Sequence, residues 1–157
     1  MATSRETLDA TPRQVVARLH ERVRDDYDMD GQADLYAPDG ILELPFAPLG
    51  APRRIVGREA IRAFLGAAGM RARLAGRRIV RYDPLVLHET ADPEVIVAEF
   101  DLHGEMAETG AAYRLSFIQV LRVRDGQIVS MRDYFDPRAL ATALVDEPGP
   151  RPLPAGE

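Results

Sequence analysis

Two polar residues interrupt apolar faces of two neighbouring predicted strands, and their types suit acid–base chemistry. Over residues 113–123 every second side chain is apolar or aromatic except Gln119, and over residues 128–135 the face that begins at Val129 is interrupted by Asp133. A carboxylate buried among apolar groups without a partner is costly, so an aspartate there is expected to have a raised pKa. Asp133 is therefore a candidate general acid or base, and Gln119 a candidate hydrogen-bond donor to a substrate oxygen.

Each candidate also has a structural interpretation. Asp133 could pair with Arg132 or Arg138, or lie exposed at a strand end, and Gln119 could bond to backbone at a dimer-facing surface. The phenols of Tyr27, Tyr36 and Tyr113 could reach a pocket, although a tyrosine more often lies in a core or at a rim with its hydroxyl hydrated.

Other polar clusters are weaker candidates. Glu99, Asp101 and His103 alternate on one strand face, which could hold a metal ion through oxygen and nitrogen ligands, but a solvated or dimer-facing surface explains them better. We therefore predict no metal site. The arginines in residues 71–81 could attract a phosphorylated or carboxylated substrate, although a solvated loop is the simpler interpretation. His20 and His88 have no evident partner in the sequence.

The composition excludes several kinds of chemistry. The 157 residues contain no Cys and no Lys, so thiolate nucleophiles, iron–sulfur ligation and Schiff bases are ruled out. The net charge of −5 argues against a nucleic-acid surface, and no dinucleotide or phosphate-binding motif is present. The sequence has neither an apolar run of about 20 residues nor a secretory signal, so we expect no membrane association and a cytoplasmic location.

The remaining pattern predicts the elements that position these residues. Thr11 and Gln14 form a capping box for a first helix with an apolar face, and Asp30 is expected to cap a second, short helix. The other expected elements, in chain order, are a strand over 41–46, a helix over 58–65, strands over 79–88, 95–106, 113–123 and 128–135, and a helix over 137–144. Helices followed by an antiparallel meander indicate an α+β domain.

We expect three segments along the chain. Residues 1–10 form a flexible N-terminal segment, residues 11–145 form one domain, and residues 146–157 form a proline-rich tail that can be neither a helix nor a central strand.

Three stretches carry a resemblance to a known family: Leu35-Tyr-Ala-Pro-Asp-Gly40, residues 57–65, and Val120 to Pro137 with its Met131-Arg-Asp-Tyr-Phe-Asp136 core. Together they resemble the nuclear-transport-factor-2-like superfamily in its SnoaL-like branch. The resemblance implies a cone, in which a curved antiparallel sheet packs on N-terminal helices around an apolar pocket, and a homodimer formed through the sheet. The superfamily includes isomerases, dehydratases, cyclases, epoxide hydrolases and non-catalytic modules.

The resemblance can be carried over residue by residue. The last third is similar to limonene epoxide hydrolases, whose catalytic aspartate matches Asp133, but their other catalytic positions are apolar here: Phe100, Leu102, Leu42 and Leu44. A pocket glutamate of phenazine-biosynthesis proteins also matches Asp133, and an oxyanion donor of ketosteroid isomerases matches Gln119.

We therefore expect a cofactor-independent acid–base enzyme that acts on a small hydrophobic metabolite by isomerisation, dehydration, cyclisation or epoxide opening. Asp133 and Gln119 are the expected catalytic residues. The substrate is expected to contact Leu42, Leu44, Phe64, Phe100, Leu102, Tyr113, Leu115, Phe117 and Met131. The alternative is a non-catalytic module that binds a small molecule or assists assembly, and a second polar group within reach of Asp133 would favour the enzyme.

Overall fold

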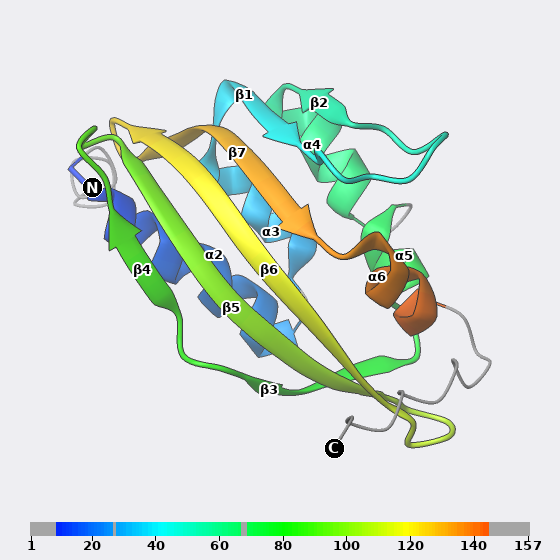
Figure 1. The fold of residues 1–157 in the computed structure, drawn as a ribbon. Coiled ribbons are helices and arrows are strands. Elements are labelled where there is room, and N and C mark those ends of the chain that lie inside the picture. Colours follow the sequence, from blue (N-terminus) through cyan, green and yellow to red (C-terminus); the bar gives the residue numbers. More distant parts are fainter. Residues whose placement is uncertain (1–8, 27, 67–68, 145–157) are drawn as a thin grey trace.

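A computed structural model describes residues 9–26, 28–66 and 69–144 of the chain. Residues 1–8 of the expected N-terminal segment, Tyr27 and the whole expected C-terminal tail, 146–157, lie outside the described residues. The described part contains helices on one face of a curved sheet, as the α+β prediction requires (Figure 1). In the described residues no helix has both the length and the apolar character needed to cross a membrane.

The first helix, α2 (Pro12–Asp26), begins at the predicted capping box. The Thr11 N–H donates to Gln14 Oε1 at 2.9 Å, and the Gln14 N–H donates to Thr11 Oγ1 at 3.3 Å. Val15, Val16 and Leu19 are completely or almost completely buried against the sheet. The helix therefore presents one apolar stripe to the core, as its spacing predicted.

The second helix is shorter than expected and has a different cap. It is α3 (Met29–Gln32), followed by a 3-10 turn, η1 (Ala33–Leu35). Asp28 and not Asp30 caps it, because the Asp28 carboxylate accepts the Gly31 N–H at 3.0 Å. The prediction of Asp30 as cap was therefore wrong by two residues, which is the usual uncertainty of a helix boundary.

Three further helices follow along the chain. They are α4 (Arg58–Leu65), α5 (Met70–Arg73) and α6 (Pro137–Leu144), of which α4 and α6 have the predicted bounds. Arg62 fastens α4 to the preceding segment, since its guanidinium donates to the Asp34 carboxylate at 2.8 Å and to the Asp30 carbonyl at 3.0 Å. In Figure 1, α5 and α6 lie beside one another past the end of β7.

Seven strands form one mixed sheet in the order β2-β1-β7-β6-β5-β3, and β4 pairs with the same edge of β5 as β3. The strands are β1 (Tyr36–Glu43), β2 (Arg54–Val56), β3 (Arg77–Tyr82), β4 (Val86–Glu89), β5 (Val95–Met106), β6 (Ala112–Arg124) and β7 (Gln127–Phe135). All pairs are antiparallel except β1 with β7. The expected purely antiparallel sheet is thus corrected at one pair, where the long connection from β1 to β7 permits parallel pairing.

Several strand predictions differ from the structure. The strand expected over 41–46 is β1, which begins five residues earlier and ends three residues earlier, and β2 was not expected. Two further differences have local reasons. The single strand expected over 79–88 is split into β3 and β4 at Pro84, which has no N–H to contribute to a ladder. In β7, Val123 pairs with Ile128 and Arg122 with Ser130, so Val129 is an extra residue in a bulge. Ile128, and not Val129, is therefore the buried residue at the start of that face.

Candidate active site

A cavity of about 130 Å³ lies between α2 and the sheet. All nine residues expected to contact a substrate line it, together with Gln119 and Asp133. They are Leu42, Leu44, Phe64, Phe100, Leu102, Tyr113, Leu115, Phe117 and Met131. The structure therefore brings the whole predicted set together, and His20 and Gln32 are further polar residues in the described lining.

Gln119 and Asp133 face each other on adjacent strands in the middle of this lining. Burial raises the pKa of the Asp133 carboxyl to about 7, and a hydrogen bond from the Gln119 side chain opposes this rise. The Asp133 Oδ1 atom is buried and has no hydrogen-bond partner among the described residues. No arginine among those residues forms an ion pair with the Asp133 carboxylate. Asp133 lines the cavity. The alternative interpretation from the sequence, an ion pair between Asp133 and an arginine, does not describe this site.

His20 on α2 completes a polar row that the sequence did not reveal. Its Nε2 atom lies 3.2 Å from Gln119 Oε1, and the imidazole is 4% exposed. Burial lowers the pKa of His20 to about 4, so the ring is neutral near pH 7. A neutral ring that donates from Nε2 to Gln119 Oε1 turns the amide N–H₂ of Gln119 toward Asp133. His20 is four residues after Val16 and therefore lies on the apolar face of the helix. This position is the feature of the sequence from which its burial could have been predicted.

Aromatic rings form a row across four strands beside these polar groups. Phe100 stacks on Phe117 with ring centres 4.9 Å apart and an interplanar angle of 10°, and Tyr82 stacks on the other side of Phe100 at 5.9 Å. Phe135 continues the row next to Phe117. The His20 ring meets the row at Phe100, 4.4 Å away and nearly perpendicular. These rings exclude water and provide flat apolar surfaces.

The tyrosines occupy different places. Tyr113 lines the cavity, and its ring lies over Gly104 on the neighbouring strand. Tyr36 is fully buried in the core, where its hydroxyl donates to Met131 Sδ at 3.7 Å and burial raises its pKa. Tyr82 was not singled out from the sequence, but it lines the cavity and its pKa is also raised by burial.

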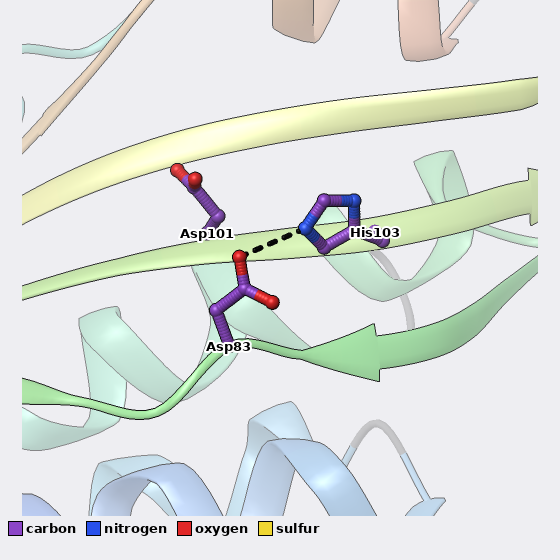
Figure 2. A group of neighbouring side chains, drawn as sticks. All are labelled: Asp83, Asp101 and His103. Carbon is purple, nitrogen blue, oxygen red and sulfur yellow. Dashed lines mark hydrogen bonds and ion pairs between the residues drawn. The ribbon is translucent and has the colours of Figure 1, made fainter.

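The polar cluster on the opposite sheet face consists of Asp83, Asp101 and His103 (Figure 2). His103 Nε2 lies 3.0 Å from Asp83 Oδ2 and also 3.0 Å from the guanidinium of Arg81, while Arg114 binds Asp101. Two guanidinium groups already balance the two carboxylates, so the donor set does not favour a further cation. Glu99, the third member of the expected face, pairs instead with His88 at 2.6 Å.

The geometry allows proton transfer inside an apolar enclosure. A carboxyl group with a pKa near neutrality can both release and accept a proton, which is the property required of a general acid–base. Gln119, which is itself bonded to His20, holds one side of this carboxyl, and the Oδ1 atom has no partner in the described part of the chain.

Comparison with known proteins agrees with the fold. Residues 16–131 match the model of the SnoaL-like domain. A PhzA/B-like protein of Pseudomonas aeruginosa is 38% identical over 124 residues, which cover 78% of this chain and 83% of that protein. A provisionally assigned isomerase of Bacillus subtilis, whose crystal structure is known, is 29% identical with a TM-score of 0.71 over 82% of this chain and 88% of its own. A provisionally assigned polyketide cyclase of Xanthomonas campestris shares the fold at 21% identity, with a TM-score of 0.65 over 91% of this chain and all of its own.

The curved sheet, the helices on one face and the enclosed pocket define a protein of the nuclear-transport-factor-2-like superfamily. The chain belongs to the SnoaL-like family within it, and the predicted membership is confirmed.

Proposed function

We propose that the protein is a cofactor-independent acid–base enzyme of the isomerase or cyclase type that acts on a small hydrophobic metabolite. One observation carries the proposal: Asp133 lies in the wall of an apolar cavity opposite Gln119, and its Oδ1 atom is buried without a partner among the described residues. This environment raises the pKa of the carboxyl to about 7. The similarity to a provisionally assigned isomerase supports this class of reaction. Dehydration and epoxide opening use the same kind of group and remain further reactions to test.

The proposed reaction is a proton shift next to a carbonyl group. Ionised Asp133 removes a proton from carbon, the carbon–hydrogen bond breaks, and its electron pair moves to the carbonyl oxygen as an enolate. The protonated carboxyl then returns the proton to a second carbon, which completes an isomerisation. In the ring-closing alternative, the enolate carbon bonds to a second carbonyl carbon of the same molecule, the electron pair of that C=O π bond moves to its oxygen, and the resulting alkoxide takes the proton from Asp133. A primary amide has two N–H groups, so Gln119 can donate one to Asp133 and the other to the substrate oxygen.

The same geometry favours an enzyme over a module that only binds. A pure binding pocket has no need for a carboxyl whose pKa lies near neutrality. Here Asp133 has a polar partner, Gln119, and Gln119 in turn has His20 at 3.2 Å. A row of this kind orients the carboxyl and holds its proton at a defined place, which catalysis requires and ligand retention does not.

The experiment is deuterium exchange followed by NMR in D₂O. A panel of cyclic enones and unsaturated ketones is incubated with the wild type, and we expect deuterium uptake next to the carbonyl, or migration of the double bond, for at least one compound. Asp133→Asn should abolish the reaction, whereas Asp125→Asn, which removes an exposed carboxylate from a hairpin turn, should leave it intact. Equal rates for wild type and Asp133→Asn would refute the proposed role.

We also propose that two copies associate through the sheet face that α2 does not cover. Val86 and Ile118 are 52% and 44% exposed there, and they border a concavity with Phe46 and Tyr134. Light scattering should give the mass of a dimer for the wild type and a lower mass for Ile118→Lys. A monomeric wild type would contradict this proposal without affecting the pocket chemistry.

A further inference from the structure

A second hollow of about 420 Å³ adjoins the cavity that contains Asp133. The two share five lining residues, which are Leu44, Phe64, Met70, Phe135 and Leu140. Beyond these residues the hollow, which we call the outer groove, runs between the segment 47–52 and helices α5 and α6. Because the shared residues are apolar, the cavity and the outer groove present one continuous apolar surface to a ligand.

The outer groove contains a single charged residue in its described lining, Arg73 on α5. Arg73 is exposed, and no carboxylate pairs with it in the part of the chain that the structure describes. Its neighbour Arg71 differs, because it lies 3.5 Å from the Asp30 carboxylate. Among the described residues, Arg73 is thus a cation without a carboxylate counter-charge at an apolar groove, and a guanidinium in this situation favours an anionic group, above all a carboxylate.

The inner cavity limits the other end of the ligand. Its volume of about 130 Å³ is close to that of an engineered apolar cavity of about 150 Å³ that accepts benzene. Its walls include the stacked rings of Phe100 and Phe117. A flat group of one ring therefore fits the inner cavity, whereas a fused system of several rings exceeds it.

From these observations we infer that the substrate is an elongated carboxylic acid, with a small planar ring in the inner cavity, an apolar chain in the outer groove and its carboxylate at Arg73. This inference rests on the proposed function for the chemistry at the ring, but the binding arrangement itself does not depend on catalysis. It assigns a role to Arg73 within the 71–81 cluster. The other arginines of that cluster make ion pairs or donate to backbone carbonyls.

The test measures binding of phenylacetate, phenylbutyrate and phenylhexanoate, and of their uncharged primary amides, by titration calorimetry and NMR. We expect affinity to depend on chain length, with the best acid binding about tenfold more tightly than its amide, as one charge-assisted contact allows. Arg73→Gln should remove this advantage and leave amide binding unchanged. Arg71→Gln, which makes the same change of charge on the same helix, should preserve it.

Three results would overturn the inference: equal affinity of acids and amides, an equal loss in Arg73→Gln and Arg71→Gln, or no dependence on chain length. Unfolding temperatures of the variants, which should equal that of the wild type, check that the exposed substitutions leave the fold intact. Asp133→Asn separates the two proposals, because it should still bind the best acid at Arg73 while losing proton exchange. Selective acid binding without exchange in the wild type would refute the proposed function alone, and exchange without selective acid binding would refute the substrate class alone.

Discussion

Gln119 and Asp133 are direct cross-strand partners on β6 and β7, and the burial that surrounds them determines the properties of the carboxyl. Gln119 is 6% exposed and bonded to His20, so it cannot turn away to water. The amide is therefore fixed between a neutral imidazole and a carboxyl whose proton is lost only near neutral pH.

The first prediction concerns the dependence of stability on pH. The pKa of Asp133 is near 4 in the unfolded chain and about 7 in the folded protein, so between these values the folded state holds the extra proton. Stability from this group is therefore present at low pH and is lost as pH rises toward 7, by up to about 1.4 kcal/mol per pH unit. Denaturant unfolding of wild type and Asp133→Asn at several pH values should show the variant gaining relative stability as pH rises from 4 to 7.

His20 acts in the opposite direction and provides an internal check. Its pKa falls from 6.5 in the unfolded chain to about 4 in the folded protein, so its contribution is lost as pH falls through that window. With Asp133 replaced, the positive slope from His20 between pH 4 and 6.5 should become visible. Asp125→Asn should follow the wild-type curve throughout. Parallel curves for wild type and Asp133→Asn would show that Asp133 is not held in a raised-pKa environment.

Much of this arrangement could be predicted from the sequence, because Gln119 and Asp133 lie on two strands in which apolar side chains recur at every second residue. Gln119 and Asp133 were visible as single polar residues on apolar faces, and that alternation needs no long-range information. His20 was not recognised, since its partner lies 99 residues away and one histidine on a helix has many possible environments. The parallel β1–β7 pair and the bulge at Val129 were also missed, because pairing direction and bulges depend on contacts between distant segments.

The second prediction concerns the carboxyl directly. The hydrogen bond from Gln119 stabilises the ionised form of Asp133, so it holds the pKa of that carboxyl below the value that burial alone would give. Gln119→Leu should raise the Asp133 pKa above about 7, as measured by carbon-detected NMR of the carboxyl. A pKa that stays unchanged would mean that the amide does not donate to Asp133.

The third prediction concerns the contact between Gly104 and Tyr113. A Cβ atom at Gly104 would overlap the Tyr113 ring, so Gly104→Ala must displace a residue that lines the cavity. Overpacking of this kind costs about 1–3 kcal/mol, and ligand affinity should change as well. In a Tyr113→Ala background, Gly104→Ala should lower the free energy of unfolding only slightly. The measurement is the change in unfolding free energy caused by Gly104→Ala in each of the two backgrounds. An equal cost in both backgrounds would place the strain elsewhere.

The last prediction tests whether His20 and Gln119 act as a unit. His20→Leu leaves the buried Gln119 Oε1 without its donor, and Gln119→Leu leaves the His20 Nε2–H without its acceptor. Each single substitution should cost about 1–3 kcal/mol, whereas the double variant replaces both polar partners by apolar groups and should cost less than the sum. The coupling free energy from the four unfolding curves should thus reach about 0.5–3 kcal/mol. A coupling free energy near zero would show that the two side chains lie close together without a hydrogen bond. In that case His20 would not be the group that orients the Gln119 amide toward Asp133.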